Sequence, residues 1–280
     1  MKTCVRKPFL LPALVICLGL ILAGRVGAQT FQNVYNFSVD FIYFNGNVSN
    51  SDGYGPNGSL ILSGNTLYGT AWQGGSWGNG TVFAVSTAGT SFTNLYSFTA
   101  TPPYPAKSTN SDGATPVAGL VLAGNTLYGT ASAGGTNGNG TVFAINTDGT
   151  GFTNLHCFSA KATNSLGLYT NSDGYNPAAG LLLAGSTLYG TTQFGGTNGN
   201  GTVFAINTNG TGFTNLYSFT GGSDGAYPEA GLLLSGNILY GTADGGGINA
   251  RLQSTVTSPE TTIVGFGSTV TPVSLSLGGS

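Results

Sequence analysis

The sequence predicts an all-β fold, a β-propeller built from about four blades of four antiparallel strands each. A signature of four residues, Leu-Tyr-Gly-Thr, begins at Leu67, Leu127, Leu188 and Leu239, at intervals of 60, 61 and 51 residues by subtraction. A period of this size indicates an array of similar supersecondary units. Between the signatures lie short runs rich in β-branched and aromatic residues, a composition typical of strands.

The second copy of the repeat shows the four strands expected in one unit. Runs of strand length cover residues 119–123, 126–131, 141–146 and 152–158, and the last two are joined by Asp148-Gly149. An Asp-Gly pair favours a tight hairpin turn. Four hairpin-connected strands at this period are typical of a propeller blade. A parallel β-helix is the main alternative, but its coils are shorter and lack such hairpins.

Two of these runs differ in their patterning. The third run, Val142-Phe143-Ala144-Ile145, is apolar without alternation, which predicts a strand buried on both faces between neighbouring blades. The fourth run alternates, so we expect Phe152, Asn154, His156 and Phe158 to share one face.

The N-terminus predicts export. Basic residues near the start, a short apolar stretch over residues 9–23 and small residues at 26–28 are typical of a secretory signal peptide, residues 1–28. The apolar stretch is shorter than the roughly 20 residues of a membrane span. We therefore expect no transmembrane segment after cleavage, and a location outside the cell, on its surface or in the periplasm.

The remaining chain is acidic and sparsely charged. Residues 29–280 contain three basic and nine acidic residues, a net charge of −6 (3 − 9). This charge argues against nucleic acid as a partner, because such surfaces need clustered Lys and Arg. Cys157 is the one cysteine beyond residue 28, so no internal disulfide is expected within residues 29–280.

The repeat domain is expected over residues 29–247, and the two ends of the chain depart from the repeat. The run Phe31–Phe37 matches the fourth strand of the first full copy, Phe92–Phe98, and we expect it to close the last blade and so cover an open sheet edge. Residues 248–280 form a non-repeat tail with strand-like pieces at 262–266 and 273–277. This tail either completes the fourth blade or marks a truncated or frame-shifted end.

The segment AGLVLAGNTLYGTASAGGTNGNGTVFAINTDGTGFTNLHCF, residues 118–158, resembles the GloVer tandem repeat of exported bacterial proteins. The resemblance extends over about residues 31–247. It implies a repeat array that is joined to differing C-terminal sorting anchors and has no established catalytic activity. The tail of this chain lacks a hydrophobic span followed by basic residues, and in this it departs from that arrangement.

His156 and Cys157 are the first residues to consider for catalysis. His156 occupies a position held by tyrosine in the other copies, Tyr35, Tyr96 and Tyr217, and Cys157 one held by serine. Adjacent residues of a strand point to opposite faces, so the two do not form a nucleophile and base pair. Both are interpreted as structural positions, and no catalytic residue is predicted.

An Asp-Gly-x-x-Pro element supplies one acid per copy, at Asp52, Asp112, Asp173 and Asp224. The favoured interpretation is an Asx-turn that leads into the first strand. The alternative is a ring of carboxylates that holds a hard cation such as calcium. No other cofactor is predicted.

The copies differ most just after the Leu-Tyr-Gly-Thr signature, where Trp72-Gln73 and Gln193-Phe194 occur, and at Trp77 in a glycine-rich loop. Trp72 either fills space between blades or belongs to a shallow stacking surface for a sugar or another flat ligand. The candidate ligand-binding residues are Trp72, Gln73, Trp77, Gln193 and Phe194. Long loops between blades carry Lys107 and Lys161 and are where repeat scaffolds place partner contacts.

These features predict an exported, non-enzymatic propeller that acts as an extracellular binding or cell-surface structural module, with a glycan or a protein as its partner. The alternative is a propeller enzyme, or a cofactor-bearing domain, that acts on carbohydrate. An enzyme should show polar residues that break the repeat at convergent positions, whereas the breaks here are aromatic or small, and this favours binding over chemistry.

Overall fold

The computed structural model describes residues 32–38, 42–44, 47–102, 109–247 and 273–276, with the backbone alone for 42–44, 47–48 and 273–276. All the strands lie in the unit Val34–Ser280. The predicted signal peptide lies outside the described residues, and the export that it implies stays a prediction. No helix among the described residues is long and apolar enough to cross a membrane.

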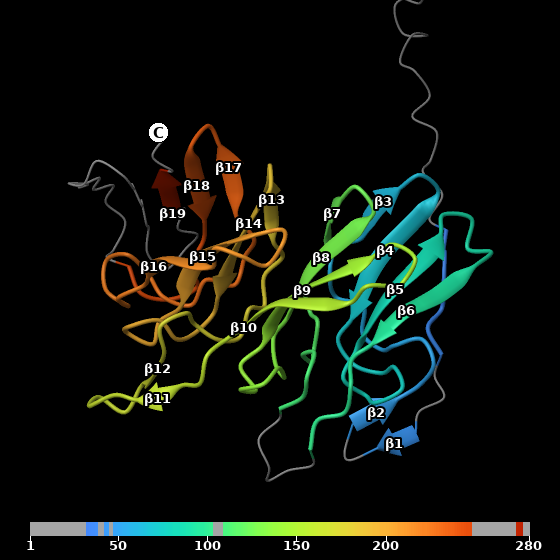
Figure 1. Ribbon diagram of the computed structural model, residues 1–280, viewed down its shortest axis with the longest axis horizontal. Coiled ribbons are helices and arrows are strands. Elements are labelled where there is room, and N and C mark those ends of the chain that lie inside the picture. The colour runs from blue at the N-terminus through green and yellow to red at the C-terminus, as the bar shows by residue number, and fades with distance from the viewer. Residues whose placement is uncertain (1–31, 39–41, 45–46, 103–108, 248–272, 277–280) are drawn as a thin grey trace, which may run out of the picture. The chain divides into compact units, whose positions relative to one another are not determined.

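The described chain is all-β, with four main sheets that follow one another along the sequence (Figure 1). We call them units one to four. Unit one contains β3 (Ile61–Ser63), β4 (Thr66–Ala71), β5 (Thr81–Ser86) and β6 (Phe92–Ser97). Unit two contains β7 (Val121–Ala123), β8 (Thr126–Ala131), β9 (Thr141–Asn146) and β10 (Thr153–Cys157). Unit three contains β13 (Leu182–Ala184), β14 (Thr187–Thr192), β15 (Thr202–Asn207) and β16 (Thr214–Ser218).

Unit four has three described strands, β17 (Leu233–Ser235), β18 (Ile238–Gly241) and β19 (Val273–Ser276). The last comes from the tail and takes the place of the third strand, because Leu239 pairs with Leu275 as Leu188 pairs with Ile206 in unit three. The strand-like piece at 273–277 is thus confirmed over its first four residues, and the piece at 262–266 lies outside the described residues. Two short hairpins, β1 (Ile42–Phe44) with β2 (Asn47–Ser49) and β11 (Ala162–Thr163) with β12 (Tyr169–Thr170), occupy the loops before units one and three.

Every pairing between the named strands is antiparallel, and strands of each main sheet pair in sequence order. This arrangement confirms four-stranded antiparallel sheets in units one to three and excludes the parallel β-helix. The third strands are buried on both faces, as predicted. In β9, Phe143 and Ile145 pack towards unit one, whereas Val142 and Ala144 pack towards unit three.

The prediction that Phe152 and Phe158 share a face is wrong. Phe152 stacks on Tyr96 of unit one, whereas Phe158 packs in the cluster shared with unit three. The reason is a register shift in β10, where Asn154 pairs with Phe143 but His156 pairs with Val142. A bulge of one extra residue reverses the alternation of side chains beyond it. Units one and three carry the same shift.

The Leu-Tyr-Gly-Thr signature is explained by packing between units. In unit two, Leu127 packs towards unit one and Tyr128 towards unit three. A Cβ atom on Gly129 would lie 2.6 Å from Phe143 Cζ, so only glycine leaves room for that ring. The hydroxyl of Thr130 donates a hydrogen bond to the carbonyl of Ala179 in unit three, at 3.1 Å. The four residues thus serve both neighbouring units.

The N-terminal segment differs from its prediction. Residues 32–38 are not a strand. Instead Val34, Tyr35 and Phe37 pack on Phe83 and its neighbours in unit one. Tyr35 and Phe37 occupy on unit one the positions that Tyr96 and Phe98 occupy on unit two. The segment therefore makes the side-chain contacts of a preceding fourth strand, although it is not itself a strand. Completion of unit four by this segment stays a prediction.

Candidate functional site

Three of the four acids of the Asp-Gly-x-x-Pro element bind the end of the preceding fourth strand, and Asp52 binds the N-terminal segment in the same way. In unit two, Asp112 Oδ2 accepts hydrogen bonds from the hydroxyl of Tyr96 and the backbone N–H of Thr99, both at 2.8 Å, and the Thr99 hydroxyl donates to Oδ1. We call this arrangement, one carboxylate with three donors from the preceding strand, the carboxylate clasp. It links two sequential units through polar contacts beside their apolar interface.

The same clasp occurs four times, with the aromatic residue, the hydroxyl residue and the acid in equivalent places. The four sets are Tyr35, Ser38 and Asp52; Tyr96, Thr99 and Asp112; His156, Ser159 and Asp173; Tyr217, Thr220 and Asp224. The predicted Asx-turn is therefore not made by these acids. An asparagine two residues earlier makes it, as Asn110 shows by accepting from Gly113 N–H and donating to Gly113 O.

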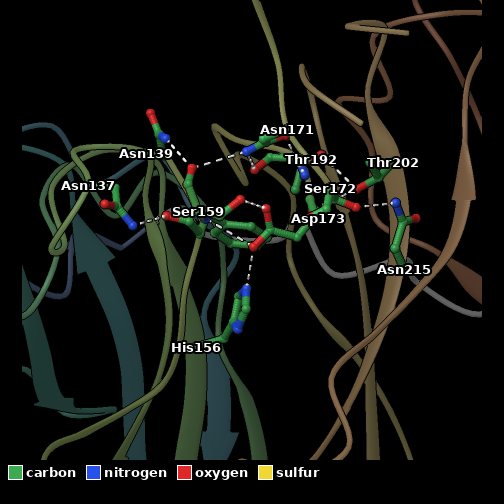
Figure 2. Close-up of polar contacts among 12 residues, drawn as sticks. Asn137, Asn139, His156, Ser159, Asn171, Ser172, Asp173, Thr192, Thr202 and Asn215 are labelled. Atoms are coloured by element: carbon green, nitrogen blue, oxygen red, sulfur yellow. Dashed lines mark hydrogen bonds and ion pairs between the residues drawn. The ribbon is translucent and has the colours of Figure 1, made fainter. Parts of the chain in front are cut away.

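The histidine clasp is the one variant of the four (Figure 2). His156 Nε2 lies 2.9 Å from Asp173 Oδ2, and the ring stacks on Phe213 of unit three with centroids 3.7 Å apart. The neighbouring Cys157 instead has its sulfur 3.5 Å from the amide nitrogen of Asn154. The two side chains thus bind different partners, and the structure brings them into no catalytic pair.

The clasps shift the pKa of their three tyrosines and of Asp173. Burial raises the pKa of Tyr35 to about 12, and the hydrogen bond and negative charge of Asp52 add to the effect. Burial and the clasp carboxylate raise the pKa of Tyr96 and of Tyr217 in the same way. Burial by itself raises the pKa of Asp173, but the hydrogen bonds from His156 and Ser159 outweigh it, so the pKa is lowered. These shifts follow from structural contacts that recur in each unit.

The clasp acids do not assemble into a shared cation site in the described part of the chain. Each carboxylate faces its own clasp, and no group of three or more His, Cys, Asp or Glu side chains converges among the described residues. Calcium binding by these acids thus stays a prediction, and the occupied oxygen atoms argue for a structural role.

The residues that follow the signature pair with the Asp-Gly-x-x-Pro element of their own unit. In unit three, Phe194 forms a bridge with Tyr175, and Gln193 N–H donates to Asn176 O at 3.0 Å. Asn176 has a φ of 59°, and its own N–H donates to Asn139 O of unit two. Thr115 and Tyr227 adopt the same left-handed conformation. Such conformations are costly for non-glycine residues, and here they let one peptide connect two units.

Phe194 is the centre of an aromatic cluster. Its ring lies 5.4 Å from that of Tyr175 and 5.4 Å from that of Tyr227 in unit four. The ammonium of Lys161, from the loop that carries β11 and β12, lies 4.3 Å from the Tyr175 ring centre and 5.2 Å from that of Tyr169. We define the aromatic cluster as Lys161, Tyr169, Tyr175, Phe194 and Tyr227.

Polar groups lie beside this cluster. Asn176 Nδ2 donates to Gln193 Oε1 at 2.5 Å, and Gln193 Nε2 donates to the exposed carboxylate of Glu229. Burial raises the pKa of Tyr175, and the nearby Tyr169 and Tyr227 add to the effect. The predicted residues Gln193 and Phe194 thus come together with partners from three segments of the chain.

The other predicted ligand-binding residues lie in unit one. Trp72 packs over Gly55, where a Cβ atom would lie 2.1 Å from the indole nitrogen, and Gln73 forms a bridge with Tyr54. Trp77 is exposed in its loop. The contact of Trp72 with Gly55 lies within unit one, whereas Phe194 also contacts Tyr227 of the next unit. Lys107 lies outside the described residues.

Sequence reasoning missed Tyr169, Tyr175 and Tyr227. Tyr175 and Tyr227 stand inside the Asp-Gly-x-x-Pro element, at the two positions that vary between copies. Variation there is the signal that points to them, because these positions pair with the variable residues after the signature.

Comparisons with known proteins give distant likenesses among solved structures. A nidogen/laminin complex matches at 18% identity over 64% of this chain and 52% of that chain, with a TM-score of 0.40, so the chain spans about half of that structure's length. A putative TolB from Agrobacterium tumefaciens matches at 11% identity over 82% and 71%, with a TM-score of 0.41. An α-L-arabinofuranosidase from Clostridium thermocellum matches at 10% identity over 79% and 72%, with a TM-score of 0.38. Likenesses this distant carry no argument about function.

Curated proteins give no match to this chain. The family model of the Gloeobacter/Verrucomicrobia repeat matches it twice, over residues 27–167 and 104–264. The matched ranges include all four clasps and all four copies of the signature. The chain therefore belongs to the Gloeobacter/Verrucomicrobia repeat family.

Proposed function

We propose that this protein is an exported, non-enzymatic β-propeller that binds an extracellular carbohydrate through its aromatic cluster. The observation that carries this proposal is the position of Phe194, which lies between Tyr175 and Tyr227 where the other copies have glutamine, alanine or glycine. The propeller itself is supported by sequential antiparallel sheets that pack on one another through a repeated interface.

Carbohydrate is the ligand class that suits this surface. Aromatic rings bury the apolar faces of sugar rings, and a few placed polar groups bind the hydroxyls. Tyr169 is 54% exposed and supplies an accessible ring. Gln193 and Glu229 supply an amide and a carboxylate beside the rings. Lys161 makes cation–π contacts with Tyr169 and Tyr175, and these contacts orient the two rings before a ligand binds.

Binding is favoured over catalysis because of where the acids lie. Hydrolysis of a glycosidic bond requires two carboxyl groups on either side of the bond. The acids of the repeat each accept three hydrogen bonds in a clasp. At the aromatic cluster, Glu229 is the one acid beside the rings among the described contacts, and it accepts a hydrogen bond from Gln193 rather than facing a second carboxylate.

Titration of a soluble glycan panel, followed by calorimetry, tests the proposal. We expect one class of glycan to bind, and Phe194→Ala to weaken it by about tenfold, the loss that one aromatic stacking contact implies. Gln73→Ala is the matched control, because Gln73 occupies the equivalent position in unit one. The proposal fails if no glycan in the panel binds, or if Phe194→Ala binds as tightly as the parent and the control.

A further inference from the structure

Unit three differs from the other three units at one buried position of its second strand. Thr192, the last residue of β14, is fully buried, and it carries a hydroxyl where the equivalent residues are alanine. Those residues are Ala71, Ala131 and Ala243. A buried hydroxyl costs free energy unless it is hydrogen-bonded. Unit three also carries Phe194, so the extra hydroxyl and the ring at the centre of the aromatic cluster occur in the same unit.

The hydroxyl of Thr192 is bonded to Phe194. It donates a hydrogen bond to the carbonyl oxygen of Phe194 at 3.0 Å. Its oxygen lies 2.8 Å from Oγ1 of Thr202 on β15, and Figure 2 shows both threonine side chains. Each hydroxyl has one proton, so Thr202 is the donor between the two threonines when Thr192 donates to Phe194. The other acceptor of Thr202, the carbonyl of Asp173, is farther away at 3.3 Å. The two threonines thus form a hydrogen-bonded chain that ends at Phe194.

The carbonyl that accepts this hydrogen bond also joins two residues of the aromatic cluster. It accepts the backbone N–H of Tyr175 at 2.9 Å, and the rings of Phe194 and Tyr175 are stacked. Phe194 lies two residues beyond the end of β14, so its backbone is held by the bridge to Tyr175 and by the threonine hydroxyl. In unit two the equivalent carbonyl, that of Ala133, accepts a backbone N–H at 2.8 Å, and Ala131 has no hydroxyl to add to it. The reinforced carbonyl thus belongs to the unit that carries the ring.

We propose that Thr192 is a positioning residue for the ligand site. Its hydroxyl holds the backbone of Phe194, and through it the stacked pair of Phe194 and Tyr175, in the arrangement that a carbohydrate contacts. The proposal rests on the proposed function for its ligand, whereas the order of the ring is a property of the free protein. Side chains held in place before binding lose less conformational entropy when the ligand binds, which strengthens affinity. A packing role alone does not account for the hydroxyl, because alanine occupies the same position in the other three units.

Nuclear magnetic resonance of the full chain with labelled phenylalanine tests the positioning without a ligand. The resonances of Phe194 are identified by their loss in Phe194→Ala, and the ring currents of Tyr175 and Tyr227 shift them from the values of an unstructured phenylalanine. Thr192→Val keeps the shape of the side chain and removes the hydroxyl, and we expect it to move these resonances towards the unstructured values. Thr192→Ser keeps the hydroxyl and should restore them.

Thr70→Val is the matched control for the loss of a buried hydroxyl. Thr70 is buried, and its hydroxyl donates to the carbonyl of Ala118 at 2.8 Å, between units one and two. This variant should leave the resonances of Phe194 unchanged. Thr192→Ala, which installs the residue of the other units, is a second variant, and circular dichroism establishes that each variant is folded. Unchanged Phe194 resonances in folded Thr192→Val and Thr192→Ala overturn the proposal.

Calorimetry with cellohexaose, xylohexaose and chitohexaose measures the effect of this positioning on binding. For a probe that binds the parent, Thr192→Val should weaken binding about two- to tenfold, the range that one hydrogen bond implies, and Thr192→Ser should recover most of the loss. In a Phe194→Ala background, Thr192→Val should have no further effect. Equal affinities of the parent and Thr192→Val, or an undiminished loss in the Phe194→Ala background, overturn the proposal. If the resonances move but no probe binds, carbohydrate binding is contradicted, whereas the positioning of Phe194 by Thr192 is supported.

Discussion

His156 takes the place of a clasp tyrosine, with its Nε2 2.9 Å from Oδ2 of Asp173, while its ring stacks on Phe213. In unit one, Tyr96 makes both contacts in the same way, to Asp112 and to Phe152. The ionised carboxylate accepts hydrogen bonds only, so the imidazole nitrogen that faces it carries a proton. The substitution therefore preserves the function of the position while changing its chemistry from a phenol to an imidazole.

Replacement of His156 separates stacking from hydrogen bonding. His156→Phe keeps a ring on Phe213 but removes one donor to the buried Asp173, and should lower the free energy of unfolding by about 1–3 kcal/mol. His156→Tyr restores the donor found in the other units and should recover most of that loss. Urea denaturation at neutral pH measures both variants. Equal stability of the phenylalanine and tyrosine variants would contradict a bonding role for this position.

Acid should weaken the clasp of unit two with unit three. The pKa of Asp173 in the folded chain is lowered from its ordinary 3.8, so the unfolded chain takes up a proton first as the pH falls. The stability from this group is complete above about pH 4 and is lost as the pH falls through the folded-state value. Melting temperatures recorded from neutral pH down to about pH 2 should show the difference between parent and Asp173→Asn narrowing in acid. A constant difference across that range would count against the assignment.

Alkali should weaken the tyrosine clasps. The pKa of Tyr35 is raised from 10.0 to about 12, and those of Tyr96 and Tyr217 are raised as well, so the unfolded chain loses these protons first. Their contribution is complete below pH 10 and is lost as the pH rises above it. Phenolate absorbance followed with circular dichroism should show late-titrating tyrosines whose ionisation coincides with unfolding. Complete titration near pH 10 in a still folded chain would show that the clasp phenols are accessible.

Calcium should leave the melting temperature unchanged. Both oxygen atoms of the clasp carboxylates already accept hydrogen bonds, and a cation would have to displace those donors. Thermal melting with added calcium and with a chelator measures this directly. A saturable rise in melting temperature would contradict this expectation and support the alternative in which the four acids bind calcium.

The glycine of the signature should not tolerate a side chain. Gly129→Ala places a Cβ atom 2.6 Å from Phe143 and 2.7 Å from Leu120, and overpacking of this kind costs about 1–3 kcal/mol. Gly180→Ala is the matched control, since the nearest atom to its added Cβ lies 3.6 Å away. The two variants, compared by urea denaturation, should differ by more than about 1 kcal/mol. Equal effects would show that the ring of Phe143 moves aside freely.

Several parts of this architecture were predictable from the sequence because they are local. The hairpin at Asp148-Gly149 and the double-sided burial of Val142–Ile145 follow from turn chemistry and patterning within a few residues. The bulge between Asn154 and His156 was not predictable, because nothing in the alternating pattern marks the extra residue. The partner of each acid was missed for a different reason. It lies in the segment before the acid's own unit, 17 residues away for Tyr35 and 16 for Tyr96.

The candidate site, too, was predictable from the sequence only in part. Variation between copies identified Gln193 and Phe194 but also suggested that Trp72 joins them, because equivalent positions look alike along the sequence. Tertiary contacts place Phe194 against Tyr227 of the next unit and Trp72 against Gly55 of its own. Which neighbour a variable side chain meets depends on the next unit's own variable residue, and repeat comparison alone does not contain that information.

A double-mutant cycle between Tyr96 and Asp112 is the most direct test of the claim that the recurring acids join neighbouring units. The free energy of unfolding is measured for the parent, Tyr96→Phe, Asp112→Asn and the double variant, with Tyr169→Phe as an exposed control. The clasp predicts a coupling energy of about 1–3 kcal/mol between the two positions. Additive effects, within about 0.5 kcal/mol, would contradict it.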